Sequence, residues 1–282
     1  MNKNILLFTS GILVVIGILA FSPILGISDG VNTFVTLLAG VLFVLLHGSM
    51  TIGWKHIFVF LAITIAVSFT LEAIGVATGL VFGPYYYTDN LGPKILGVPP
   101  MIQAGYTAMG YASLMTARVI LNFRESPKKL GSIVAIALVG AFIMVSWDVA
   151  MDPYQSTLAG DWIWTTGGQY FGIGIHNFIG WFVTVFTFIF LYQLYASRYP
   201  EKMQKEVKQS RYLWSQPTLY YALVGLGMIV VPYVGGVSLP YASPQNYNGP
   251  LIDLVYSIAL IATFVMGTPV AIALAKIFTS KE

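Results

Sequence analysis

Residues 130–181 read LGSIVAIALVGAFIMVSWDVAMDPYQSTLAGDWIWTTGGQYFGIGIHNFIGW, an apolar run followed by a polar and aromatic segment. The part from Trp147 to Trp181 holds three of the eleven acidic residues, four of the six tryptophans and one of the three histidines. Polar groups are costly inside a membrane, so a place where they gather in an apolar chain indicates a functional site. We predict that this stretch forms the rim and floor of a buried active site, completed by residues 72–87 (EAIGVATGLVFGPYYY).

The composition is that of an integral membrane protein. Hydrophobic residues make up 57% of the 282 residues and charged residues only 9%, whereas soluble domains have about 25% charged residues. The chain has no cysteine, which excludes disulfides, iron–sulfur clusters and cysteine-ligated zinc. The net charge of +3 is small, and we predict no nucleic-acid partner.

Eight apolar runs have about the length that a helix needs to cross a bilayer. They predict an all-α fold, a polytopic membrane bundle of about eight transmembrane helices in a single domain over residues 1–282. Seven spans, with the first or second run re-entrant, is the alternative. The first run could pass for a signal peptide, but it is long for one and lacks a clear small-x-small cleavage site. The approximate limits are 5–26, 32–52, 56–81, 98–121, 130–152, 174–197, 217–238 and 251–277.

The basic residues predict how the spans are oriented. If the N-terminus is inside, the inside segments contain every lysine and arginine except Lys94. The positive-inside rule is then satisfied, so we predict cytoplasmic termini in a multi-pass protein of the cell membrane. The hydrophilic loop 198–216 serves as an orientation signal in this arrangement.

Two carboxylic acids lie at similar depth in the predicted spans. Glu72 is sixteen residues beyond His56, or about 24 Å at the helical rise. Asp148 is eighteen residues beyond Leu130, or about 27 Å. Both spans start on the predicted cytoplasmic side, so both carboxyl groups reach the outer edge of the hydrocarbon layer.

Glu72 shares one helical face with Gly75 and Gly79, and small residues at this spacing let a neighbouring helix approach closely. We therefore expect Glu72 to point into the bundle. It forms either a structural hydrogen bond to a neighbouring helix or part of an intramembrane site. A carboxyl group in apolar surroundings can stay protonated at neutral pH, which suits a general acid.

Asp148 and Asp152 form a D-x-x-x-D pair one helical turn apart, and Pro153 is expected to end their helix. In prenyltransferases such pairs hold magnesium diphosphate, with a second acidic motif and basic residues. This chain has one such motif and an outer side with almost no lysine or arginine, so we predict no metal site. The other alternative is a pair of aspartates that caps a helix end in water.

Residues 82–87 (FGPYYY) leave the third span, where Gly83 and Pro84 are expected to stop the helix. Tyrosines and tryptophans at a membrane edge commonly form an interfacial belt, and the alternative is an aromatic pocket that tolerates a cation. His176 could shuttle a proton or, as we favour, bond to backbone. The substrate-binding candidates are Tyr85, Tyr87, Trp147, Asp161, Trp164, His176 and Asn177.

Several motifs in these stretches are specific in combination. They are E-x-x-G-x-x-x-G-x-x-F-G-P-Y-x-Y at 72–87, V-P at 98–99, W-D-x-x-M-D-P at 147–153, and D-W-x-W-x-x-G-G-x-Y-F-G-I at 161–173 with N-F-x-G-W at 177–181. Through them, residues 54–200 resemble a family of carotenoid biosynthesis membrane proteins that includes carotenoid 1,2-hydratases and bisanhydrobacterioruberin hydratase. The rest of the chain agrees with that family only in hydropathy.

The resemblance implies addition of water across the terminal 1,2 double bond of an acyclic carotenoid, which gives a tertiary alcohol. It implies a reaction without a cofactor. The expected partners are a carotenoid substrate that arrives from the lipid phase and the membrane lipids themselves. Association with other carotenoid enzymes is left open.

This chemistry suggests roles for the three carboxyl groups. Protonation of carbon 2 gives a tertiary cation at carbon 1, and water then captures the cation. We predict Asp148 or Glu72 as the acid, with the other of these or Asp152 orienting the water. The aromatic candidates would line the cation pocket.

Three other functions fit the same sequence. A carotenoid end-group cyclase uses the same protonation but excludes water. A prenyltransferase would depend on magnesium, and a carotenoid or lipid carrier would bind pigment without changing it.

Overall fold

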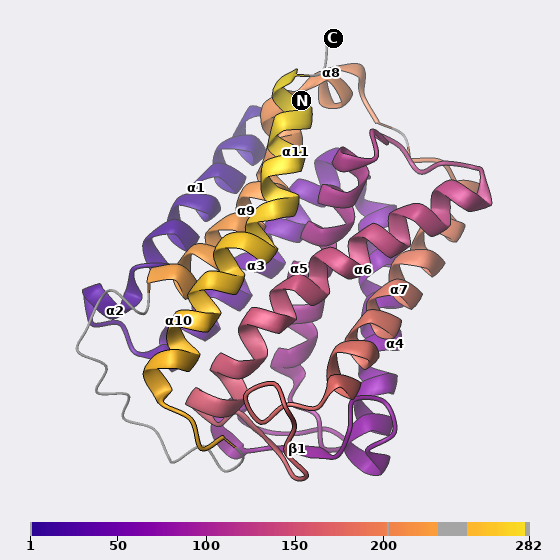
Figure 1. Ribbon diagram of the computed structural model, residues 1–282. Coiled ribbons are helices and arrows are strands. Elements are labelled where there is room, and N and C mark those ends of the chain that lie inside the picture. The colour runs from indigo at the N-terminus through magenta and orange to yellow at the C-terminus, as the bar shows by residue number, and fades with distance from the viewer. Residues whose placement is uncertain (1, 202, 231–246, 280–282) are drawn as a thin grey trace.

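The structure is a computed structural model that describes residues 2–201, 203–230 and 247–279. This part of the chain is a bundle of long helices with a small two-stranded sheet at one end (Figure 1). The helices are α1 (Lys3–Leu19), α2 (Ser22–Leu25), α3 (Asp29–Thr51), α4 (Trp54–Thr78), α5 (Pro100–Ile120), α6 (Leu130–Asp152), α7 (Ile175–Arg198), α8 (Lys205–Gln209), α9 (Arg211–Val230), α10 (Leu251–Ile261) and α11 (Gly267–Thr279). The strands are β1 (Tyr85–Tyr87) and β2 (Trp162–Trp164).

A helix forms over each of the eight predicted apolar runs, so the prediction of a helical fold is confirmed. Among the described residues, five helical segments are long and apolar enough to cross a membrane, namely those at 30–51, 54–78, 130–159, 175–198 and 251–279. The other three are α1, which is apolar but has 17 residues, α5 and α9. The end of the seventh predicted run, 231–238, and the basic residues Lys202 and Lys281 lie outside the described residues.

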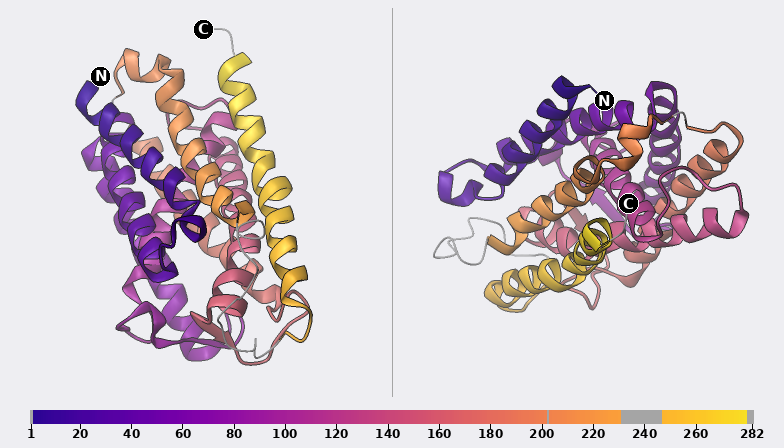
Figure 2. Two further views of the ribbon diagram at one scale, coloured as in Figure 1. Left: turned by 90° about the vertical axis from the view of Figure 1, so that its left-hand side faces the viewer. Right: turned by 90° about the horizontal axis from the view of Figure 1, so that it is seen from above.

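The two ends of the bundle differ. The start of α1, the end of α11 and α8 lie together at one end, and β1 lies at the other (Figure 1). Seen from above, α5 runs inside the bundle (Figure 2), and every residue from Tyr106 to Val119 is buried. A helix surrounded by protein does not need an apolar face towards lipid, which explains why α5 is less apolar than its neighbours.

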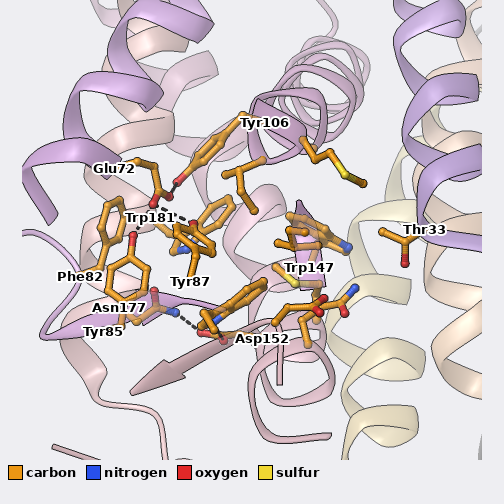
Figure 3. A pocket seen from close by; sticks show the side chains of 18 of the residues that line it. Thr33, Glu72, Phe82, Tyr85, Tyr87, Tyr106, Trp147, Asp152, Asn177 and Trp181 are labelled. Atoms are coloured by element: carbon orange, nitrogen blue, oxygen red, sulfur yellow. Dashed lines mark hydrogen bonds between the residues drawn. The ribbon is translucent and has the colours of Figure 1, made fainter. Parts of the chain in front are cut away.

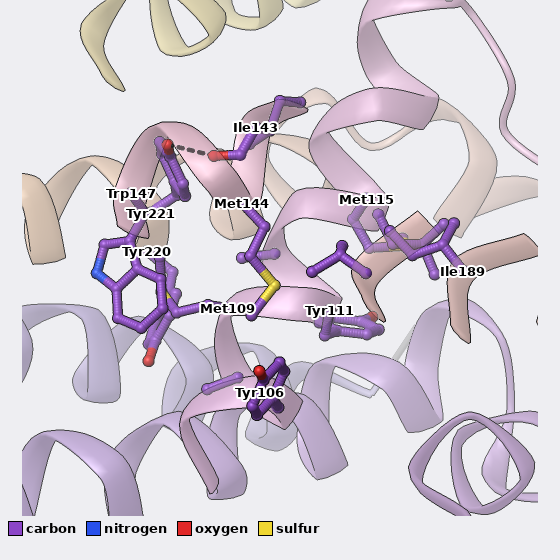
Figure 4. Close-up of a cluster of buried hydrophobic side chains, with 14 of the residues drawn as sticks. Tyr106, Met109, Tyr111, Met115, Ile143, Met144, Trp147, Ile189, Tyr220 and Tyr221 are labelled. Carbon is purple, nitrogen blue, oxygen red and sulfur yellow. Dashed lines mark hydrogen bonds between the residues drawn. The ribbon is translucent and has the colours of Figure 1, made fainter. Parts of the chain in front are cut away.

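An apolar layer crosses the middle of the bundle between α5, α6, α7 and α9 (Figure 4). Along α5, Met109 and Met115 lie in this layer, between Tyr106 near one end and Arg118 near the other. Tyr221 of α9 donates a hydrogen bond to the Ile143 carbonyl oxygen at 2.7 Å, which satisfies the one polar group of that side chain. The layer therefore separates buried polar groups at the two ends of the bundle.

The prediction that Gly83 and Pro84 end the third span was wrong. α4 ends at Thr78, and Gly79 caps it in the left-handed conformation with φ of 71° and an N–H bonded to the Gly75 carbonyl. Glycine adopts this conformation without a steric penalty. The chain therefore leaves the helix four residues before the expected turn.

The small-residue face of α4 packs against Phe82 of the following turn. A Cβ atom at Gly75 of α4, or at Gly180 of α7, would lie 2.6 Å from the Phe82 ring. The ring thus fits between α4 and α7 only because both positions are glycine. Glu72, one turn earlier on α4, points into the bundle as expected and is 2% exposed.

The α-helix α6 ends at Asp152, immediately before Pro153, as predicted, but the chain keeps a helical path beyond it. This path continues as a π-helical turn, η2 (Pro153–Ala159), and ends at Gly160 with φ of 70°. Proline has no N–H to donate to the carbonyl four residues earlier, that of Val149. The Tyr170 hydroxyl donates to this carbonyl instead, at 2.7 Å.

The sheet joins the two stretches that the sequence singled out, and no strand was predicted there. β1 and β2 pair antiparallel, with Tyr85 opposite Trp164 and Tyr87 opposite Trp162. These four side chains are buried, whereas Tyr86 is exposed. Because side chains alternate along a strand, the four large aromatic groups lie on one face of the sheet, towards the bundle.

Candidate active site

A cavity of about 100 Å³ lies between this sheet and the helices (Figure 3). It is larger than the roughly 15 Å³ that one water molecule needs. The lining residues come from α3, α4, α5, α6, α7 and both strands. They are Thr33, Leu37, Glu72, Phe82, Tyr85, Tyr87, Leu91, Met101, Ile102, Gly105, Tyr106, Trp147, Met151, Asp152, Gln155, Asp161, Trp162, Trp164, Asn177 and Trp181.

Glu72 lies at one side of the cavity, where three tyrosine hydroxyls donate to its carboxyl group. Tyr85 and Tyr87 (at 2.9 Å) donate to Oε2, and Tyr106 donates to Oε1 at 2.8 Å. The pKa values of the Tyr85 and Tyr87 hydroxyls are raised well above the usual value for tyrosine. The larger cause is burial, and the second is the nearby carboxyl group of Glu72. Both hydroxyls therefore stay protonated and act as donors.

Asp152 lines another side of the cavity and is also hydrogen-bonded. The Trp162 indole N–H donates to Oδ1 at 2.8 Å, and the Asn177 amide donates to Oδ2 at 2.5 Å. The same amide nitrogen lies 3.2 Å from Oδ2 of Asp148, to which it also donates. Asn177, in the first turn of α7, thus joins the two aspartates of α6.

Asp148 lies behind Asp152, one turn back along α6, and does not line the cavity. Its side chain is buried, and Oδ1 has no hydrogen-bond partner among residues 2–201, 203–230 and 247–279. An unpaired buried carboxylate oxygen is costly. The aspartate pair is thus less well compensated than Glu72.

Aromatic rings form most of the walls. Tyr106 stacks on Trp181 with centroids 4.3 Å apart, and Trp147 packs edge-on against Trp181 at 5.9 Å. On the sheet side, the rings of Tyr85 and Trp164 lie 4.9 Å apart. Aromatic faces attract cations, and no lysine, arginine or histidine is among the described residues that line the cavity.

Most of the predicted site residues meet at this cavity. Of the three carboxylic acids, Glu72 and Asp152 line it, and Asp148 reaches it only through Asn177. The substrate-binding candidates that line it are Tyr85, Tyr87, Trp147, Asp161, Trp164 and Asn177. The structure does not place His176 there, because its side chain is exposed on the outer side of α7.

Tyr106, Trp162 and Trp181 line the cavity and contact its carboxyl groups or its other aromatic rings, but they were not among the predicted site residues. Trp162 and Trp181 lie in the stretch that the sequence singled out. Tyr106 lies outside both stretches, on α5, and follows the V-P motif at 98–99. Its only sequence signal is a hydroxyl in a run of small and apolar residues.

Comparisons with known proteins identify the family of the chain. The family model described as "Carotenoid biosynthesis protein" matches residues 32–243, which include every residue that lines the cavity. Bisanhydrobacterioruberin hydratase of Haloarcula japonica is 26% identical over 117 residues, which cover 42% of this chain and 38% of that protein. The chain thus spans well under half of that relative's length. No solved structure matches this chain.

The family match extends over most of the chain, from the first turn of α3 to beyond α9. It includes both strands, both carboxyl-bearing helices and the aromatic loop between them. This chain belongs to the carotenoid biosynthesis protein family.

Proposed function

We propose that this protein is a carotenoid hydratase, which adds water across the terminal 1,2 double bond of an acyclic carotenoid. One observation carries the proposal: Glu72 and Asp152, from distant parts of the chain, line one aromatic cavity without a basic residue among its described lining. The similarity to bisanhydrobacterioruberin hydratase supports a reaction of this class.

Protonation of an alkene needs an acid held away from bulk water. Asp148 and Asp152 are one turn apart and share the Asn177 amide, and no lysine or arginine of the described residues forms a salt bridge with either of them. Two buried like charges repel each other, so such a pair favours sharing one proton. Asp152 faces the cavity and delivers this proton, and Asp148 acts through Asp152 as a positioning residue.

In the proposed reaction, Asp152 transfers its proton to carbon 2 and a tertiary cation forms at carbon 1. The aromatic faces of Trp147 and Trp181 and the negative carboxyl groups stabilise this cation. A water oxygen forms the new bond to carbon 1, and Glu72 takes the proton that the water loses. Return of that proton to the aspartate pair completes a cycle in which only water is consumed.

The polar part of the lining supports hydration rather than cyclisation. A cavity holds ordered water when it offers the water several hydrogen-bond partners. The Glu72 and Asp152 carboxyl groups, the Asn177 amide and the hydroxyls of Tyr87 and Tyr106 provide such partners. A cyclase would need the same acid but a dry cavity around the cation.

The proposal is tested with purified protein, lycopene and oxygen-18 water. Hydration adds the mass of one water molecule and places the heavy oxygen in a product hydroxyl, whereas cyclisation leaves the mass unchanged. A product without the label contradicts the hydratase. Recovery of unchanged pigment would instead support the carrier.

We also propose that the eight long helical segments span the cell membrane with both chain termini on the cytoplasmic side. This orientation is supported by the clustering of the basic segments at the end of the bundle opposite the sheet (Figure 1). Because the chain has no cysteine, single cysteines can report sidedness. An impermeant maleimide should label Asp89→Cys in intact cells and Lys129→Cys only after lysis, and the reverse pattern would refute the orientation.

A further inference from the structure

A second cavity, of about 170 Å³, adjoins the first. It lies between α1, α3, α6 and α9, near the end of the bundle that carries the sheet. Five residues line both cavities, so the two share a wall. They are Thr33, Leu37, Trp147, Met151 and Gln155.

The second cavity is mainly apolar beyond this junction. Its apolar walls come from the last turns of α1 and α9, where Gly227 of α9 lies beside Ala20. The polar residues on the α2–α3 side bond to one another: Asn32 donates to Ser22 at 2.9 Å, and Thr36 donates to Asn32 at 3.2 Å. The apolar residues that line only this cavity are Ile16, Leu19, Ala20, Leu223, Val224, Gly227 and Met228.

The two adjacent cavities, with the wall that they share, mark out a path across the bundle. Glu72 and Asp152 lie in the first part, and Thr33 lies at its far side beyond Trp147 (Figure 3). The second cavity begins at Thr33 and Leu37 and leads to α1 and α9. Among the described residues that line the path, acidic side chains occur only in the first cavity.

We propose that the second cavity binds the polyene segment next to the reacting end group, so that Leu37 and Val224 set how well a long substrate binds. This inference rests on the proposed function. An acyclic carotenoid is a linear hydrocarbon far longer than the first cavity, so its body must leave the acids by an apolar route. The second cavity offers such a route, because burial of hydrocarbon against these walls stabilises the complex.

The test uses two substrates with the same terminal alkene, lycopene and the short terpene geraniol. Val224→Phe fills the second cavity, and Leu37→Phe narrows the junction. Leu226→Phe is the matched control, since Leu226 lies on the same helix and lines neither cavity. Overfilling a packed cavity is unfavourable, so each blocking variant should lower kcat/KM for lycopene about tenfold or more.

Geraniol reaches only the first cavity, so its hydration should stay within about twofold of wild type in Val224→Phe and Leu226→Phe. Leu37→Phe is assessed with lycopene alone, because Leu37 also lines the first cavity. Lycopene binding, followed by quenching of tryptophan fluorescence, should weaken by the same factor as kcat/KM in the two blocking variants. Melting temperatures check that the variants fold. An equal loss for both substrates, or no loss for lycopene, overturns the inference.

The binding measurement keeps this test separate from the proposed function. If wild type hydrates neither substrate, the hydratase fails. Weaker lycopene binding in Val224→Phe than in Leu226→Phe would then still support the polyene site, and equal binding would refute it.

Discussion

The bundle buries ionisable groups at both ends, and it compensates them in opposite ways. At the end away from the sheet, the Arg118 guanidinium donates to both carboxylate oxygens of Glu201, at 3.2 and 2.5 Å. Tyr192 donates to the same carboxylate at 2.8 Å, as does Ser126 at 3.2 Å. None of these residues lines either of the two cavities described above.

At the sheet end, the carboxyl groups of Glu72 and Asp152 face the cavity, and the donors that the described residues offer them are neutral. Glu72 has three hydroxyls, and Asp152 has an indole and an amide. A paired buried charge has no proton to give, whereas a carboxyl group without a cation can hold one and release it. From this difference we infer that the paired cluster supports structure and the sheet-end cluster supports chemistry. The predictions below test this inference.

The largest expected effect is on stability and comes from the paired end. Arg118→Leu leaves Glu201 buried without its cation, which should lower the free energy of unfolding by about 3–5 kcal/mol. Denaturation in detergent measures this loss, and turnover per folded molecule should not change. Adding Glu201→Gln to Arg118→Leu should restore part of the stability. If Arg118→Leu alone is as stable as wild type, the pair does not have the structural role assigned to it here.

Next in size is the loss of the acid. Asp152→Asn keeps the shape and one acceptor oxygen, which can still accept from Trp162, but it loses the oxygen that accepts from Asn177. Turnover should fall at least about 100-fold, because the amide has no proton to give to the alkene. The melting temperature should stay the same or rise, since an uncompensated carboxyl group is removed. Asp148→Asn should cost less than Asp152→Asn and should shift the pH profile of turnover, because Asp148 does not face the cavity.

Asp253→Asn is the control for these substitutions. Asp253 is an exposed aspartate in the first turn of α10 and lines neither cavity. Its replacement should leave turnover unchanged. Near-normal turnover in Asp152→Asn would remove the proposed acid.

A smaller effect is expected when Glu72 loses one donor. Tyr106→Phe keeps the stacking on Trp181 but removes a hydrogen bond to a carboxyl group, which should lower turnover about tenfold. Tyr111→Phe is the matched control on the same helix, where the hydroxyl bonds to His47 and Thr51 far from the cavity. Equal losses in the two variants would mean that the donors to Glu72 have no special role.

The smallest effect is the pH dependence of the paired end. Burial alone would raise the pKa of Glu201, but the Arg118 guanidinium beside it holds the pKa below its usual value. The pair's contribution to stability is therefore present above the pKa of an unfolded glutamate, about 4.3, and is lost as pH falls through the lower folded-state value. Melting curves at decreasing pH should show this loss in wild type and not in Glu201→Gln.

Hydropathy was sufficient to locate the helices, because each long apolar run must bury its backbone polar groups in a helix. It was also sufficient to expect Glu72 inside the bundle, since a charge in such a run avoids lipid. The strands could not be predicted, because each has only three residues. They form only when two segments come together whose first residues, Tyr85 and Trp162, are 77 positions apart in the chain.

The errors at the site have physical causes. His176 precedes Asn177 in sequence, but neighbouring residues on a helix point in directions about 100° apart, so only Asn177 reaches the cavity. Asp148 and Asp152 share a helical face as predicted, yet which of them meets the cavity depends on where β2 packs. Tyr106 could not be found from local sequence, because its partner Glu72 lies 34 positions earlier in the chain.

Pro153 makes the end of α6 depend on Tyr170, whose hydroxyl replaces the N–H that proline lacks, 21 positions after the carbonyl it serves. A nascent chain that has not yet emerged past this tyrosine therefore cannot complete the helix end that carries both aspartates. Until then Asp152 also lacks Trp162 and Asn177, which come later in the chain. The hydrogen bonds that hold Asp152 are thus completed only after the chain up to Asn177 has been synthesised.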